Sequence, residues 1–152
     1  MAYQTILWPT DLSASSLRAV GHVRDVAAAH QARVVALYVG LNLCGYFPAY
    51  GNYPGEEHLR EFHGWELEQA RKKLETICSK EFAACPNLSV RVTQGEPAGE
   101  ILKAITEEKA DLVVMTTRGR GGDARGDGGP SLGAVAAKVL AVSPAPVQFI
   151  NP

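Results

Sequence analysis

Cysteine is scarce in this sequence, with three residues in 152, at positions 44, 78 and 85. The number is odd and no pair has Cys-x-x-Cys spacing, which argues against both a disulfide framework and a structural zinc site. We therefore interpret the cysteines as free thiols in a reducing compartment. The sequence predicts a cytoplasmic protein without a metal site.

An excess of charge of either sign is also missing, because 15 Lys and Arg residues stand against 16 Asp and Glu residues. Without a basic field, the chain has little non-specific attraction for a phosphate backbone. No apolar run approaches the ~18 residues that cross a bilayer, and the first residues do not have the pattern of a signal peptide. We expect neither a nucleic acid nor a membrane among the partners.

The sequence does contain enough apolar material for one core. Hydrophobic residues make up 46% of the chain and charged residues 20%. A domain of this size buries about two-thirds of the surface of its unfolded chain. Since no internal repeat, heptad run or change of composition marks a boundary, we expect one domain over residues 1–152.

Short β-branched apolar runs alternate with segments whose apolar residues recur every three to four positions. The runs predict strands and the periodic segments predict helices. Strands are expected at residues 5–8, 33–39, 87–93, 111–115 and 147–150, and helices at 13–30, 56–82, 97–109 and 131–142. We expect Pro9 to end the first strand and Trp65 to belong to the apolar stripe of the second helix. Residues 40–55 and 119–129 have no periodicity and are expected to be loops.

Strict alternation of strands and helices predicts a doubly wound α/β fold, with a parallel sheet and helices on both of its faces. In such sheets ligands bind beyond the carboxyl ends of the strands, where the strand order reverses. The residues that directly follow the strands are therefore the candidate site.

Three of these segments contain the parts of a nucleotide site. A carboxylate accepts from ribose hydroxyls, a free main-chain edge binds a base, and a glycine-rich turn before a helix offers N–H groups to phosphates. The candidates are Pro9, Thr10 and Asp11 after the first strand, Val39 after the second, and Thr116, Thr117, Arg118, Gly119 and Gly122 after the fourth. Two alternatives stay open, since Asp11, like Ser13 and Ser15, is suited to cap a helix and the glycines suit a flexible loop.

Four segments together resemble the universal stress protein family across essentially the whole chain. They are TILWPTDLSASSLRAV, QGEPAGEIL, ADLVVMTTRGRGG and GAVAAKVLAVSPAPVQFI. The resemblance implies a five-stranded parallel sheet of strand order 3-2-1-4-5, Rossmann-like and of the adenine nucleotide alpha hydrolase-like type. It also implies a homodimer that pairs the last strands, in a family divided between members that bind ATP and members that do not.

The resemblance further implies which residues would hold ATP. In the ATP-binding members these are an Asp after the first strand, a Val at the end of the second, and a motif Gly-x2-Gly-x9-Gly-(Ser/Thr). Asp11 and Val39 match the first two. The four motif positions align with Thr116, Gly119, Gly133 and Ala134. Two of the four depart from the pattern, and thirteen residues, 120–132, replace the nine between the second and third glycines.

The departures keep two interpretations of function open. Loss of the hydroxyl at Ala134 removes one donor to phosphate, which contributes about 0.5 to 1.5 kcal/mol net, while Thr116 places a Cβ where the backbone approaches the ligand or has a positive φ. The first interpretation is a stress-response factor that senses ATP, with Mg2+, through the residues above together with Val135. The alternative is a nucleotide-free dimeric adaptor for an unidentified protein partner, with the loop at 40–55 as a candidate surface.

A slow nucleotide hydrolase is a third and weaker interpretation. The sequence contains no P-loop and no nucleophile and base with informative spacing, so we assign no catalytic residue.

The last strand is the candidate surface for a second copy of the chain. Residues 146–150 should lie at an edge of the sheet, are apolar and carry no guarding lysine. Unprotected edge strands pair with other chains. We expect a homodimer through Val147, Phe149 and Ile150.

Overall fold

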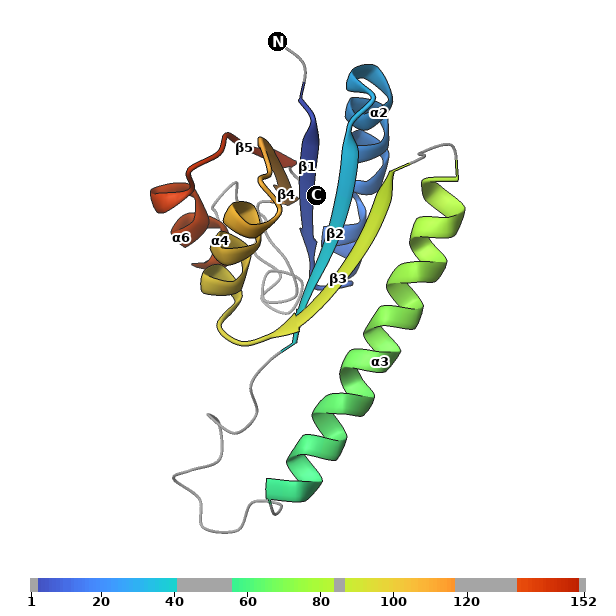
Figure 1. Ribbon diagram of the computed structural model, residues 1–152, viewed down its shortest axis with the longest axis vertical. Coiled ribbons are helices and arrows are strands. Elements are labelled where there is room, and N and C mark those ends of the chain that lie inside the picture. Colours follow the sequence, from blue (N-terminus) through green and yellow to red (C-terminus); the bar gives the residue numbers. More distant parts are fainter. Residues whose placement is uncertain (1–2, 41–55, 84–86, 117–133, 151–152) are drawn as a thin grey trace.

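A computed structural model describes residues 3–40, 56–83, 87–116 and 134–150 of the chain (Figure 1). Its strands are β1 (Thr5–Thr10), β2 (Arg33–Gly40), β3 (Leu88–Gln94), β4 (Leu112–Thr116) and β5 (Val147–Ile150). Its helices are α1 (Ala14–Leu17), α2 (Val20–His30), α3 (Glu56–Glu81), α4 (Pro97–Glu107) and α6 (Ala134–Val142). The expected alternation of strands and helices is confirmed.

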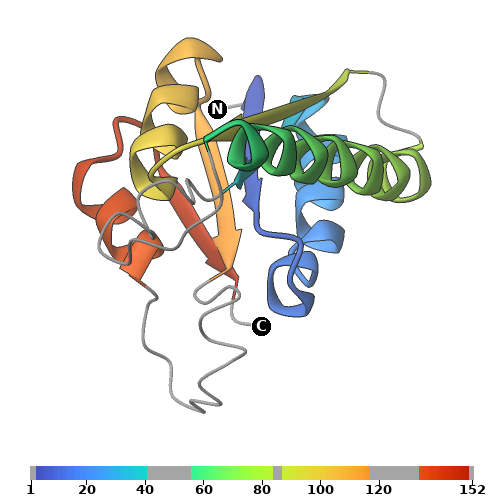
Figure 2. The same ribbon diagram turned by 90° about the horizontal axis from the view of Figure 1, so that it is seen from below.

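The strands form one parallel sheet in the order β3-β2-β1-β4-β5. This is the order that the family resemblance implied, and it places β3 and β5 at the two edges. Figure 2 shows α1, α2 and α3 on one face of the sheet and α4 and α6 on the other. The fold is therefore doubly wound, as the sequence predicted.

Each central strand contributes to two apolar clusters, because successive side chains point to opposite faces. In β1, Ile6 and Trp8 pack with α2 and α3, whereas Leu7 packs with α4 and α6. All three are fully buried, and burial of such a side chain contributes about 1.5 to 3 kcal/mol. Burial on both faces is the reason that the strand sequences are almost continuously apolar.

Pro9 does not end the first strand, which continues to Thr10. The ladder between β1 and β4 pairs Ile6 with Leu112 and Leu7 with Val113. Pro9 and Thr10 still pair with Leu37 and Tyr38 of β2. The carbonyl of Thr5 faces β4, and because main-chain groups alternate in direction along a strand, the missing N–H of Pro9 also faces β4 and removes no bond to β2. The expectation that proline stops this strand was wrong because the pairing of β1 with β2 continues past Pro9.

The helix expected at residues 13–30 is interrupted between α1 and α2. The N–H of Ala19 donates to the carbonyl of Ser16 over 3.2 Å, a bond of the tighter three-residue spacing. α1 contacts β4, whereas α2 contacts β1 and α3. The interruption lets the chain change direction between these two contacts.

Trp65 does not belong to the buried stripe of α3. Its exposed fraction is 61%, whereas Ala70, Leu74 and Cys78 on the same helix are buried. Trp65 and Leu74 are nine positions apart, which at about 100° per residue places them on opposite sides of a helix. Trp65 therefore lies on the side of α3 opposite the buried stripe. Cys78 is buried, and Cys44 and Cys85 lie outside the described residues, so the free thiols expected from the sequence stay a prediction.

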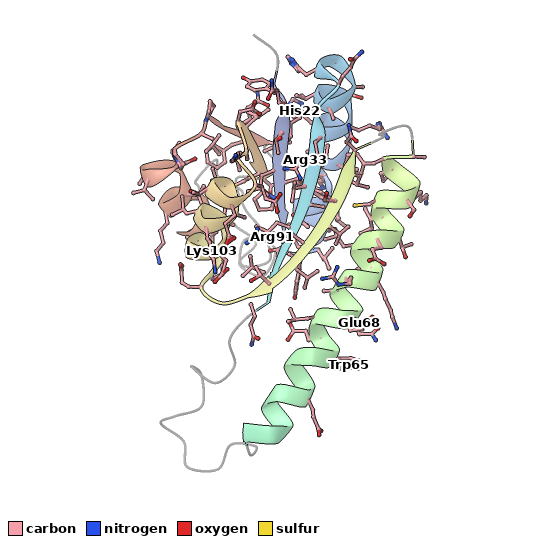
Figure 3. All side chains as sticks on the ribbon, in the orientation of Figure 1. His22, Arg33, Trp65, Glu68, Arg91 and Lys103 are labelled. Carbon is pink, nitrogen blue, oxygen red and sulfur yellow. The ribbon has the colours of Figure 1, made fainter. Side chains whose placement is uncertain are left out.

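Four charged side chains connect the β3 edge of the sheet to the end of α4. Arg33 donates to Glu108 over 3.1 Å, and Arg91 donates to Glu108 over 3.2 Å and to Glu107 over 2.7 Å (Figure 3 labels both arginines). The hydrogen bond from Arg91 holds the pKa of Glu107 below its usual 4.5. The cluster therefore joins β2 to β3 and to the end of α4, and the contact of Arg33 with Glu108 spans 75 residues.

Replacing Glu108 with glutamine should weaken this cluster, because both arginines lose their shared carboxylate. We expect a loss of about 1 kcal/mol in the free energy of unfolding at low salt, and a smaller loss at high salt because partly exposed charges are screened. Urea denaturation at the two salt concentrations measures both. Glu75→Gln, on the exposed face of α3, is the matched control and should change little. An equal loss in both variants would contradict the role of the cluster.

Glu107 should also make stability depend on acid. Because its pKa is lowered in the folded state, its ion pair stabilises the fold above pH 4.5, and this contribution is lost as the pH falls through the folded-state pKa. In Glu107→Gln the free energy of unfolding should therefore fall less steeply below pH 4.5. Denaturation curves from pH 3 to pH 7 test this, and identical slopes for the two proteins would contradict it.

Candidate functional site

The strand order reverses between β1 and β4, and both strands continue beyond the ladder that joins them. Leu7 and Val113 are the last residues paired between the two strands in the described structure. β1 then continues to Thr10 and β4 to Thr116. Since ligands of doubly wound sheets bind at such a switch point, the carboxyl ends of β1 and β4 are the candidate site.

The turn after β1 is built by two side chains that bond to the main chain. Thr10 Oγ1 accepts the N–H of Leu12 over 3.0 Å, and Asp11 Oδ1 accepts the N–H of Ser13 over 2.9 Å. Both are bonds to the residue two positions ahead, the pattern of turns formed by threonine and aspartate. Leu12 between them has φ 64°, and the left-handed helical conformation costs an L-residue about 1 to 2 kcal/mol.

Ser13, rather than Asp11, caps the helix that follows. The Ser13 hydroxyl accepts the N–H of Ser16 over 3.1 Å, and α1 begins at the next residue, Ala14. This is the geometry of an N-cap side chain. The carboxylate of Asp11 is therefore bonded within the turn, at the carboxyl edge of the sheet, and is only partly buried.

Val39 lies beside this turn at the end of β2. The ladder between β1 and β2 ends at Thr10 and Tyr38, whereas the ladder between β2 and β3 continues to Gly40. Val39 is thus one residue beyond the last pair with β1, at the same edge as Asp11.

Gly40 lies close to Leu67 of α3 at the end of β2. A Cβ at this position would lie 2.9 Å from Leu67 Cδ2, so the end of the leucine side chain would have to move. Next to it, the Tyr38 hydroxyl donates to Glu66 Oε1 over 3.1 Å. These contacts fix the first half of α3 against the carboxyl edge.

Thr116 ends β4 as an ordinary strand residue. It pairs with Ile150 and is 8% exposed. The non-glycine residues with positive φ in the described structure are Leu12, Gln31 and Lys109. The threonine therefore causes no backbone strain at the position where the family motif has its first glycine.

The structure places Pro9, Thr10, Asp11, Val39 and Thr116 at one edge of the sheet. α6 begins at Ala134, and Val135 packs partly buried against the α4 and α6 cluster. Thr117, Arg118, Gly119, Gly122 and Gly133 lie outside the described residues, as do residues 41–55.

Sequence reasoning missed the contribution of Ser16. This residue is 4% exposed and its hydroxyl donates to Thr10 Oγ1 over 2.7 Å. The signal in the sequence was that Ser16 follows the cap residue Ser13 by three positions, the spacing at which a cap side chain bonds to the helix main chain. The partner Thr10 could be recognised only from the tertiary structure.

Within the described residues, no group of three or more His, Cys, Asp and Glu side chains is placed to hold a metal ion. This leaves aside two histidines of α3, His58 and His63, because their side chains are not among those described. None of the helices in the described ranges is long and apolar enough to span a bilayer.

Comparison with known proteins gives a consistent result. A model of the Universal stress protein family matches residues 2–150. The chain is 34% identical to a curated universal stress protein of Thermus aquaticus, named for its place in the QAH/OAS sulfhydrylase 3' region, over 98% of this chain and 99% of that protein. Among solved structures, UspA from Lactobacillus plantarum superposes with a TM-score of 0.78 at 23% identity, covering 99% of both chains.

A second solved structure is a universal stress protein in complex with cAMP. It is 26% identical to this chain, with a TM-score of 0.62, and the match covers 99% of this chain and 98% of that one. The family match over nearly the whole sequence and the curated relative lead to one conclusion. The chain belongs to the universal stress protein family.

Proposed function

We propose that this chain is a cytoplasmic stress-response factor, one domain over residues 1–152, that binds an adenine nucleotide at the carboxyl ends of β1 and β4. The observation that carries the proposal is the position of the Asp11 turn at the strand-order reversal, where both strands extend beyond their ladder. The related universal stress protein with bound cAMP supports the choice of an adenine nucleotide. ATP with Mg2+ is the first nucleotide to test.

In this proposal the nucleotide spans three elements. An ionised carboxylate offers about four acceptor positions, so Asp11, which accepts the N–H of Ser13, can also accept from ribose hydroxyls. The main chain of Val39, beyond the last pair with β1, faces the base. The phosphates meet N–H groups at the start of α6, where the helix dipole favours negative charge.

The phosphate part of the site combines described and undescribed residues. Ala134 and Val135 form the start of α6. The proposed set is completed by Thr117, Arg118, Gly119, Gly122 and Gly133. Thr116 fits the proposal because its strand conformation is unstrained. The missing hydroxyl at Ala134 weakens the expected affinity without removing the main-chain donors.

Replacing Asp11 with asparagine should weaken nucleotide binding at least about ten-fold, because a charged hydrogen-bond acceptor contributes about 1.5 to 3 kcal/mol. Calorimetric titration of the purified protein with ATP and Mg2+, AMP and cAMP measures this. Asp25→Asn is the matched control, since Asp25 is an exposed aspartate of α2, and it should bind like the unaltered protein.

The results separate the interpretations. If the unaltered protein binds none of the three nucleotides, the proposal fails and the nucleotide-free adaptor is favoured. If Asp11→Asn binds as well as the unaltered protein, the assignment of Asp11 is wrong. Phosphate release from ATP that is lost in Asp11→Asn would favour the hydrolase.

We further propose that the protein forms a homodimer through β5, the edge strand next to β4. The carbonyl of Pro146 accepts the N–H of Val113 in β4. Because successive residues of a strand direct their N–H and C=O groups to opposite sides, those of Val147 and Phe149 point to the free edge. Ile150 completes the strand, which carries no charged side chain.

α6 extends this apolar edge. Lys138 pairs with Glu96 at the start of α4 over 3.6 Å, so this flank of α6 faces α4. Leu140 follows two positions later, about 200° around the helix, on the flank toward β5. It is 51% exposed. An exposed leucine beside an unpaired edge strand fits contact with a second copy of the chain.

Leu140→Glu should shift the protein toward monomer by placing a charge in the proposed interface. Val142→Glu is the control, because Val142 is also exposed but lies on the flank toward α4. Sedimentation at micromolar concentration should show a dimer for the unaltered protein and the control, and a larger monomer fraction for Leu140→Glu. A monomeric unaltered protein would overturn the dimer, and equal effects of the two substitutions would exclude Leu140 from the interface.

A further inference from the structure

A buried pair of hydroxyl groups joins the end of β1 to α1. The Ser16 hydroxyl donates to Thr10 Oγ1 over 2.7 Å, and the two residues are only 4% and 6% exposed. Burial of a hydroxyl is unfavourable unless the group is hydrogen-bonded. Ser13 already caps α1, so the bond between Ser16 and Thr10 is not needed for that purpose.

The Thr10 oxygen is used twice. Besides the bond from Ser16, it accepts the N–H of Leu12 over 3.0 Å. A hydroxyl oxygen has two lone pairs, and both are now occupied. Ser16 therefore holds the Thr10 side chain in the orientation from which it bonds to Leu12.

Leu12 needs this support because its φ is 64°. A side chain with a Cβ disfavours the left-handed region, and such a conformation persists only where neighbouring contacts enforce it. Thr10 bonds to the N–H of Leu12, and the next N–H, that of Ser13, is bonded to Asp11 Oδ1 over 2.9 Å. The turn is fixed on both sides of the unfavourable residue.

Asp11 lies between Thr10 and Leu12, so the same bonds set the direction in which its carboxylate leaves the main chain. We propose that the Thr10–Ser16 hydroxyl pair is a positioning element that holds Asp11 for the ribose of a bound adenine nucleotide. This inference rests on the nucleotide site proposed above. It gives Thr10 and Ser16 a role that acts through Asp11 and requires no contact with the ligand.

Removing either hydroxyl should weaken binding while Asp11 stays in place. We expect Thr10→Val, which keeps the side-chain shape, to raise the Kd for the nucleotide about ten-fold, and Ser16→Ala to raise it several-fold. Thr10→Ser keeps the hydroxyl and should restore the Kd to within about three-fold of the unaltered protein. Calorimetric titration gives each Kd, and urea denaturation of the same samples gives their stability.

Ser13→Ala is the matched control. It removes the cap of α1 and lowers stability, but its N–H still bonds to Asp11 and the hydroxyl pair is untouched. Its Kd should stay unchanged despite the lost stability, which separates positioning from general destabilisation.

The titrations distinguish failure of this inference from failure of the proposed function. Absence of nucleotide binding by the unaltered protein overturns the proposed function and the positioning role together. Binding by the unaltered protein with an unchanged Kd in Thr10→Val and Ser16→Ala overturns the positioning role alone. So does a Kd that rises equally in Thr10→Val and Thr10→Ser, or in Ser13→Ala.

Discussion

The five parallel strands all end at one side of the sheet, which we call its carboxyl end. The strand order reverses between β1 and β4, and the ladder between these two strands stops short of that end. Leu7 and Val113 are the last residues paired between β1 and β4, and Thr10 and Thr116 end the two strands. Pro9 cannot donate to a ladder at all. Pro9, Thr10, Asp11, Val39 and Thr116 are placed by this geometry, because β1, β2 and β4 end at the same side of the sheet.

The turn that follows β1 is shaped by side chains bonded to the main chain. Thr10 and Asp11 each accept an N–H two positions ahead, and Ser16 reaches back from α1 to the same threonine. The bonds hold Leu12 in an unfavourable conformation. Strained residues that are held in this way are often found at ligand sites, which agrees with the nucleotide site proposed here.

The two edges of the sheet differ in their chemistry. At β3, Arg91 is paired with Glu107 and Glu108, and inward-facing charge of this kind discourages pairing with another chain. At β5 the strand is uncharged, and Leu140 of α6, the helix that precedes it in the chain, is exposed. The contrast favours β5 over β3 as the surface for a second copy of the chain.

The sequence by itself determined the elements and the fold class, because apolar periodicity records burial and the central strands are buried on both faces. The resemblance to universal stress proteins added the strand order and pointed to Asp11 and Val39. The structure places both residues at the carboxyl ends of their strands, as expected. Their role in binding stays a prediction. Tertiary structure decided what depends on partners distant in the chain. It extended β1 past Pro9 because the pairing with β2 continues to Thr10. It left Trp65 exposed because the other side of α3 packs against the sheet. It also joined Ser16 to Thr10. The partner of a hydroxyl group depends on how the elements pack and leaves no periodic pattern in the sequence.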